Sequence, residues 1–326
     1  MIHMKKFYLA ETFEDAKQIL KSCSYQPISM AGSYKILGER LGVDFGPTIQ
    51  LFELLPVFLD GQRHAEIRKK MAICLANSRS KQEQAAQVAI NSLPNLAATT
   101  TPINLMTDFI RPLWRAVSRE STGYEEANLI LMDDIPRLFD SRLRVKDRLE
   151  INERLRIFIK NESDNIEEKL ILLGQNVLGS GPFIGTLTLS LHDIFSQNIG
   201  KKLKDITYPT SFPRSSLEVT DRVNKNESSD SVEPNIVRCV IHSKKYSESE
   251  KQLAMFGLGE HVCLGRPLSN NIWTLLTQKL ATMPQIVHSS ELGLKHSPVE
   301  AEFNFLEIVD PFLRPDHLYV QFTQAS

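Results

Sequence analysis

One short segment of the sequence combines a cysteine with closely spaced glycines. It reads, in order, Phe256, Gly257, Leu258, Gly259, Glu260, His261, Val262, Cys263, Leu264 and Gly265. A cysteine thiolate in a dry site needs hydrogen-bond donors, and glycines let the backbone turn tightly and aim amide N–H groups at the sulfur. Arg266 and Pro267 then begin a predicted helix, whose positive dipole end would lie near the anion. The segment predicts a loop that holds the Cys263 thiolate as a ligand.

Two other interpretations of this segment compete with a thiolate site. A buried cysteine is often an inert small hydrophobe, which is how we interpret Cys74 and Cys239. The pair Gly257 and Gly259 could also begin a dinucleotide-binding fingerprint, but that pattern requires a third glycine where Val262 stands. The four cysteines are too far apart for a zinc knuckle or a redox pair, and scattered thiols favour a cytoplasmic protein.

At all six specified positions, the segment resembles the heme-binding loop of the cytochrome P-450 superfamily, F-G-x-G-x-H-x-C-x-G. A chance match in a chain of this length is expected about once in a million. The resemblance implies heme b (iron protoporphyrin IX) as cofactor and Cys263 as its metal ligand, a thiolate that favours O–O cleavage. It also implies that His261 reaches a heme propionate. The other expected cofactor-binding positions in the loop are Phe256, Gly257, Gly259 and Gly265.

The resemblance extends to a predicted helix that begins after Asp60. His64 and Arg68 match the H-x-x-x-R pattern that binds a propionate in this family. Four residues apart, they share one helix face, so both can meet the same carboxylate. A solvated basic helix face is the alternative. The dipeptide Pro213-Arg214 resembles the strand that carries the second propionate arginine, so Arg214 is the remaining candidate.

The sequence departs from the family where the acid–alcohol pair over the iron is expected. Gly174 matches the glycine of the central helix, but Asn176 stands where the acid is usual and Val177 or Leu178 where the threonine is usual. None of these side chains can deliver a proton. Ser180 is the nearby hydroxyl. We expect these catalytic positions to support an atypical reaction, either driven by peroxide or a rearrangement, dehydration or coupling.

The predicted elements make the chain mainly α with a small β portion, a truncated cytochrome P-450-like fold. Helices are expected over 13–22, 62–77, 81–93, 104–118, 123–138, most of 143–200 and 267–281. Residues 25–59 are expected to form a long, partly irregular segment, and Pro182 predicts a kink or opening near 178–182. A strand is expected over 236–241, with further strands after 301. The E-x-x-R motif of the family's later helix is missing between 196 and 221.

We interpret residues 1–326 as a single domain, with an N-terminal helical part over 1–165 and the central helix and heme-binding loop over 166–326. The chain has 38 basic and 39 acidic residues, which gives no electrostatic reason to expect nucleic-acid binding. No window of about 18 residues is both apolar and uncharged, and the first residues do not resemble a signal peptide, so we expect neither a membrane span nor secretion.

The resemblance implies an enzyme, a P-450-like monooxygenase or related oxidoreductase that acts on a small-molecule substrate of specialised metabolism. A ferredoxin-type partner would supply electrons, docking on a basic face formed by Arg63, Lys69, Lys70 and Lys279. A non-catalytic scaffold that binds and activates a partner enzyme is the alternative. A heme-based sensor is less favoured because no output domain is recognisable.

Overall fold

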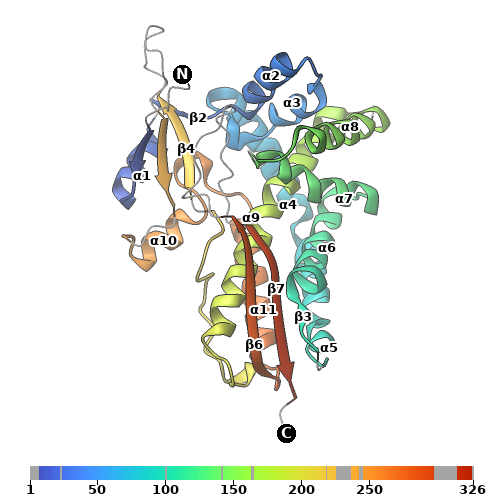
Figure 1. Cartoon of the computed structure of the whole chain (residues 1–326), viewed down its shortest axis with the longest axis vertical. Helices are drawn as coiled ribbons and strands as arrows, with labels where there is room; N and C mark the ends of the chain where they lie inside the picture. The colour runs from blue at the N-terminus through green and yellow to red at the C-terminus, as the bar shows by residue number, and fades with distance from the viewer. Residues whose placement is uncertain are drawn as a thin grey trace.

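The computed structural model is mainly helical, with two small sheets lying beside the helices (Figure 1). The structure describes residues 7–22, 24–99, 101–140, 142–162, 165–217, 219–224, 236–241, 245–296 and 314–324. The helices are α1 (Phe13–Lys21), α2 (Met30–Leu41), α3 (Gly46–Phe52), α4 (Gly61–Asn91), α5 (Leu93–Leu96), α6 (Arg111–Thr122), α7 (Glu126–Asp134), α8 (Val145–Asn161), α9 (Ile166–Ser196), α10 (Glu248–Ala254) and α11 (Arg266–Leu280). This architecture confirms the predicted class, mainly α with a small β portion.

The strands form two separate sheets. They are β1 (Phe7–Ala10), β2 (Tyr25–Pro27), β3 (Ile103–Asn104), β4 (Val219–Asn224), β5 (Ile236–Val240), β6 (Ile286–His296) and β7 (Arg314–Thr323). One sheet has the order β1-β5-β4-β2, with β1 parallel to β5, and the other has the order β3-β7-β6. Both β6 and β7 contact α9, and Figure 1 shows them running alongside it.

The strand predictions at the C-terminal end are partly confirmed. The predicted strand over 236–241 is β5, and Leu318, Val320 and Phe322 are buried on β7. The sequence reasoning did not find β6, whose polar and apolar residues alternate irregularly because bulges interrupt its pairing with β7. Phe303 and Phe305, which were expected in strands, lie outside the described residues.

The segment over 25–59, which was predicted to be partly irregular, contains two helices that the sequence reasoning did not find. The Ser29 hydroxyl accepts a hydrogen bond from the Gly32 amide at 3.1 Å and so caps the start of α2. Gly42, with φ of 64°, ends that helix in the left-handed conformation. The glycines that made this segment look irregular therefore include a helix terminator.

Helix α4 joins two predicted helices into one element of 31 residues. Asp60 is its N-cap residue by position, as expected, although its side chain makes no capping hydrogen bond. The polar residues around Ser78 had suggested a break between the two predicted helices. Instead the Ser78 hydroxyl donates to the Cys74 carbonyl at 2.9 Å, so this polar side chain has a hydrogen-bond partner within a continuous helix.

The next two predicted helices are present with different bounds. A π-helical turn over Met106–Ile110 precedes α6, and Gly123 ends α6 with φ of 67°. The segment predicted as a helix over 123–138 contains α7 followed by a 3₁₀ turn, Ile135–Phe139, which includes Pro136.

Helix α9 is the central element of the fold. It is helical at every position from Ile166 to Ser196, so the predicted opening near Pro182 does not occur. The Pro182 carbonyl accepts a hydrogen bond from the Ser216 hydroxyl at 2.9 Å, and the adjacent Phe183 and Ile184 are buried in the core. Contrary to the sequence analysis, α9 contains a window that is long and apolar enough to cross a membrane, but 61% of that window is buried inside the protein, as in an ordinary core helix.

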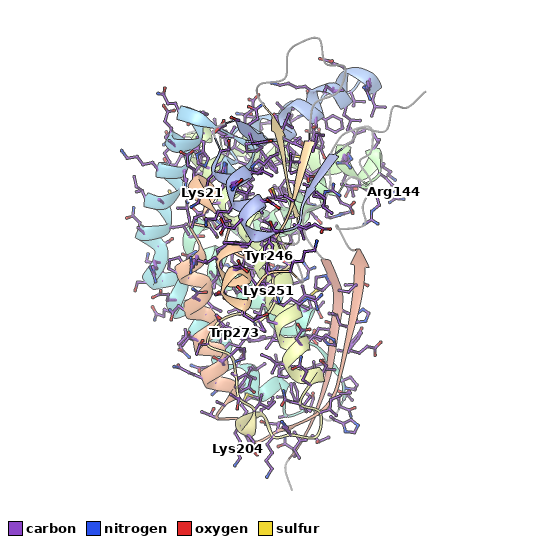
Figure 2. All side chains as sticks on the ribbon, turned by 90° about the vertical axis from the view of Figure 1, so that its left-hand side faces the viewer. Lys21, Arg144, Lys204, Tyr246, Lys251 and Trp273 are labelled. Carbon is purple, nitrogen blue, oxygen red and sulfur yellow. The ribbon has the colours of Figure 1, made fainter. Side chains whose placement is uncertain are left out.

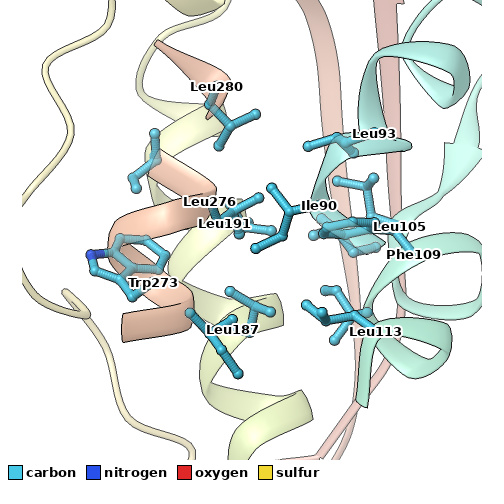
Figure 3. Packing of buried hydrophobic residues seen from close by; sticks show 14 of the residues in the cluster. Ile90, Leu93, Leu105, Phe109, Leu113, Leu187, Leu191, Trp273, Leu276 and Leu280 are labelled. Carbon is cyan, nitrogen blue, oxygen red and sulfur yellow. The ribbon is translucent and has the colours of Figure 1, made fainter. Parts of the chain in front are cut away.

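Two large hydrophobic clusters meet along α9. Its N-terminal half packs with α2, α3, α7 and α8, and its C-terminal half packs with α4, α6 and α11. Figure 3 shows the second cluster, in which Leu187 and Leu191 of α9 face Leu276 of α11 and Ile90 of α4. The Trp273 indole, labelled in Figure 2, donates to the Pro209 carbonyl at 3.0 Å and so ties α11 to the loop after α9.

No α-helix lies between α9 and β4. All residues from 197 to 217 are described, and they contain a 3₁₀ turn, Leu203–Asp205, within otherwise irregular chain. The absence of the E-x-x-R motif from this part of the sequence therefore goes with the absence of a helix that could carry it.

Candidate functional site

The loop around Cys263 connects α10 to α11 and is closed by its own backbone. The Cys263 amide donates to the Phe256 carbonyl at 2.6 Å, and the Gly257 amide donates to the Ala254 carbonyl at 2.9 Å. A Cβ atom on Gly257, where φ is +78°, would lie 2.8 Å from the His261 carbonyl oxygen. Gly259 is also left-handed, with φ of +65°. These two glycines are therefore required by the backbone, as the sequence predicted.

Gly265 has a different environment from the other two glycines. It is the N-cap residue of α11 with φ of −79°, and a Cβ there would make an ordinary contact of 3.7 Å with the Cys263 sulfur. Its backbone N–H, together with that of Arg266, lowers the pKa of the Cys263 thiol by favouring the anion. Gly265 therefore contributes to the loop through its backbone N–H, which favours the Cys263 thiolate.

The Cys263 thiol is exposed and is unpaired with any other cysteine among the described residues. Desolvation by the surrounding protein raises the pKa of this thiol, while the two backbone N–H groups and the nearby Arg68 and Arg266 guanidinium groups lower it. These donors and charges favour the thiolate without fully offsetting desolvation. Coordination by a metal ion would complete the stabilisation of the anion.

Helix α4 brings His64 and Arg68 to the same loop, as their spacing predicted. Arg68 donates a hydrogen bond to the Val262 carbonyl, next to Cys263. The His64 ring lies 4.4 Å from the His261 ring, centroid to centroid. His64 is buried, and its Nε2 atom has no hydrogen-bond partner. A buried polar atom without a partner is costly, so this position fits a polar ligand group that would complete it.

Arg222 is a basic residue of this site that the sequence reasoning missed. It is buried on β4 and, after desolvation, is the largest cause of the lowered pKa of His261, about 3. Desolvation is likewise the main cause of the lowered pKa of His64, with a contribution from Arg68. Both imidazoles are therefore neutral at pH 7, and the two guanidinium groups make the surroundings positive. The β-branched residues around Arg222 could have indicated its strand, but pairing with β5 is what brings it here.

Arg214, the residue predicted in this role, lies elsewhere. Its guanidinium is 3.5 Å from the Asp193 carboxylate near the C-terminal end of α9, and its carbonyl accepts from the Ser190 hydroxyl at 3.2 Å. Residues 210–216 form no strand. The structure does not bring Arg214 together with His64, Arg68 and His261.

Each predicted catalytic position on α9 has a local structural contact. The Asn176 carboxamide accepts from the Ser121 hydroxyl of α6 at 3.0 Å and donates to the Leu172 carbonyl at 2.9 Å. The Ser180 hydroxyl donates to the Val177 carbonyl at 3.1 Å, and Val177 itself is buried in the core. These side chains hold α9 in place in this conformation.

Comparison with known proteins identifies the fold. No protein-family model and no curated protein sequence matches the chain. Among solved structures, it is similar to P450BioI in complex with an acyl carrier protein ligated to hexadec-9Z-enoic acid (TM-score 0.67, 14% identity, 96% of this chain and 91% of that chain). It is also similar to P450 RauA complexed with a biosynthetic intermediate of aurachin RE (TM-score 0.67, 13% identity, 97% and 91%). A third similar structure is the complex of the X-domain and OxyB from teicoplanin biosynthesis (TM-score 0.56, 15% identity, 97% and 92%).

Proposed function

We propose, on the premise that this chain has the cytochrome P450 fold, that it is a heme-thiolate oxidoreductase acting on a small organic molecule. The observation that carries the proposal is the exposed residue Cys263, whose thiol pKa is lowered by the backbone N–H groups of Gly265 and Arg266 and by the nearby Arg68 guanidinium. Heme b would be the cofactor, with Cys263 as its metal ligand. A cytoplasmic location is part of the same proposal.

The residues around the loop fit a heme. Its two carboxylates need donors and positive charge, and His64, Arg68, His261 and Arg222 supply both. The unpartnered Nε2 atom of buried His64 is the feature of this structure that such a carboxylate would satisfy. Phe256, over which Arg266 lies at 5.4 Å from the ring centroid, would form part of the apolar wall. Bound in this way, heme iron with a thiolate ligand supplies oxygen or peroxide chemistry.

The reaction we propose is atypical because α9 has no acid–alcohol pair. Asn176 and Ser180 are engaged in structural hydrogen bonds, and Val177 is apolar. A reaction driven by peroxide, or a rearrangement, dehydration or coupling, does not depend on a proton-delivering pair at this place. The similar structures that contain a biosynthetic intermediate or a biosynthetic X-domain support specialised metabolism as the setting.

A scaffold that binds and activates a partner enzyme is the second candidate. Two observations favour it. No α-helix lies in the described residues between α9 and β4, and the Asn176 and Ser180 side chains of α9 form hydrogen bonds within the protein. Two of the similar structures contain a protein partner, an acyl carrier protein in one and an X-domain in the other. The predicted basic docking face is weaker than its sequence suggests, because Arg63 and Lys70 both pair with Glu167.

Optical spectroscopy tests the heme-thiolate proposal directly. Protein expressed with a heme precursor is reduced with dithionite and exposed to carbon monoxide, and we expect the red-shifted band of a thiolate–carbonyl complex. Cys263→Ser should abolish this band, whereas Cys74→Ser, a matched change at another free cysteine, should retain it. Retention of the wild-type spectrum in Cys263→Ser would show that the ligand is wrongly assigned. Failure of the wild type to bind heme would favour the scaffold.

A further inference from the structure

A cavity of about 160 Å³ lies between α4 and the start of α11. Its walls come from three successive turns of α4, from the residue that follows Cys263 and from the first turn of α11. The lining residues are Ala72, Leu75, Ala76, Arg79, Gln82, Leu264, Pro267 and Leu268. An apolar cavity of about 150 Å³ is large enough to hold one benzene ring. The space beside the Cys263 loop therefore has room for one molecule of that size.

Small side chains on α4 account for most of this space. Ala72, Ala76 and Arg79 are three or four residues apart, so they share one face of the helix. The two alanines leave open the volume that longer side chains would fill. Leu264 and Leu268 close the opposite wall with methyl groups. The larger part of the cavity is therefore apolar and suits a ring.

Two polar side chains form the other part of the lining. Gln82 is only 2% exposed, and its carboxamide oxygen accepts a long hydrogen bond, 3.4 Å, from the Ser78 hydroxyl. No described residue accepts a hydrogen bond from its amide nitrogen. The Arg79 Nε atom donates to the Glu83 carboxylate at 2.8 Å, and no described residue accepts from the two terminal nitrogens of this guanidinium. The polar part of the cavity thus offers hydrogen-bond donors.

We infer that this cavity binds an aromatic carboxylate of about the size of benzoate. The ring would lie among the alanine and leucine side chains, and the carboxylate would accept hydrogen bonds from Gln82 and Arg79. A carboxylate is the acceptor that a guanidinium binds best, because both hydrogen bonds are assisted by charge. Glu83 competes for the same guanidinium, so we expect a dissociation constant on the order of 1 mM.

The inferred site is separate from the basic groups of the proposed heme site. None of His64, Arg68, His261 and Arg222 lines the cavity. Its occupant would instead contact Leu264, the residue directly after Cys263, and so would bind as an effector at the loop. The inference goes beyond the proposed function and stands without it.

Titration calorimetry of the full-length protein with benzoate tests where the ligand binds. Ala72→Leu fills the apolar part of the cavity, so the dissociation constant should rise at least about tenfold. Ala85→Leu makes the same change at another half-buried position of α4, outside the cavity, and should bind benzoate as the wild type does. Wild-type affinity in Ala72→Leu would place benzoate elsewhere, such as at the basic groups near Cys263, and would overturn the inference.

Two charge variants test the polar contact. Arg79→Met should raise the dissociation constant about fivefold, because it removes one of the two donors. Glu83→Gln should lower it about twofold to threefold, because the competing carboxylate is gone. Arg119→Met, which removes another exposed arginine paired with a glutamate, should leave it unchanged. Weaker binding in Glu83→Gln would contradict the inferred role of Arg79.

Toluene provides a probe without the carboxylate and should bind more weakly than benzoate. Equal affinity for the two would overturn the carboxylate assignment and would favour an apolar side chain of a partner protein as the occupant. Nuclear magnetic resonance of the leucine methyl groups gives a readout that needs no variant. Benzoate should shift the signals of Leu264 and Leu268, which line the cavity. Binding without these shifts would overturn the inference.

Discussion

His64 and Arg68 of α4, His261 of the Cys263 loop and Arg222 of β4 bring their basic groups close together. The two imidazole rings are 4.4 Å apart, and burial together with the guanidinium charges lowers the pKa of both. Asp60 and Glu260 offset part of this positive charge, and an anion bound between the basic groups would offset more of it. The protein therefore supplies the basic partners of ion pairs whose acidic partners would be the carboxylates of the proposed heme.

Arg222 and Arg214 are two candidates for the second carboxylate-binding arginine, and heme retention distinguishes them. Arg222→Leu should lose heme about tenfold faster to an excess of a heme-acceptor protein, because a hydrogen bond to a charged group contributes roughly 1.5–3 kcal/mol. Arg214→Leu should lose heme at the wild-type rate, since Arg214 pairs with Asp193 instead. The reverse order of the two rates would restore the assignment made from sequence.

Sequence reasoning found the groups that are close together along the chain. The Cys263 loop and the His64–Arg68 pair each lie within ten residues, so local spacing was enough to predict them. Arg222 could not be found in this way, because its electrostatic effect on His261 depends on strand pairing between β4 and β5. The hydrogen bond between Ser121 and Asn176 depends on how α6 packs against α9, which no local pattern encodes.

Helix α9 is held against α6 by an unusually close approach at Gly179. The Trp114 ring occupies the space that a side chain at this position would need, and it also packs against Phe183 with ring centroids 5.1 Å apart. The long apolar run of α9 predicted a buried helix correctly. The sequence of Gly179, Gly181 and Pro182 had suggested an interruption of the helix. In the structure the helix continues, and the absence of a side chain at Gly179 leaves space for the Trp114 ring.

Alanine substitutions at two nearby glycines test this packing. Gly179→Ala should lower the free energy of unfolding by about 1–3 kcal/mol, because its Cβ would overlap the Trp114 ring. Gly181→Ala has nothing within 4 Å of its Cβ and should be neutral or stabilising by up to about 1 kcal/mol, through better helix propensity. Denaturant unfolding of both variants measures the difference. Equal stability of the two would contradict the packing described here.

At the scale of the whole molecule, α9 joins the two large clusters while the β1-β5-β4-β2 sheet has a polar centre of its own. Arg238 on β5 is almost fully buried, and its Nε atom donates to the Asp221 carboxylate of β4 at 3.0 Å. Asp221 is paired with Arg238 in the strand register, next to Arg222 in sequence. The sheet that carries Arg222 toward the loop is therefore also the sheet with a buried ion pair.

Arg238→Met should lower the free energy of unfolding by about 3–5 kcal/mol at pH 7, because it leaves the Asp221 carboxylate buried without this partner. Burial already raises the pKa of Asp221. In the variant the folded state therefore binds a proton more readily than the unfolded state does, and the loss should shrink as pH falls. Arg156→Met, which removes the exposed pair with Asp44, is the matched control and should cost less than about 1 kcal/mol.

The chain has two tryptophans, and both are buried against the central helices. Trp114 of α6 packs against α9 at Gly179, and Trp273 lies in α11, the helix that begins at the Cys263 loop. A heme held at Cys263 would absorb the emission of the two tryptophans by energy transfer. The native fluorescence of the protein should therefore fall as heme is added to the heme-free chain, so that the protein reports its own loading without a label.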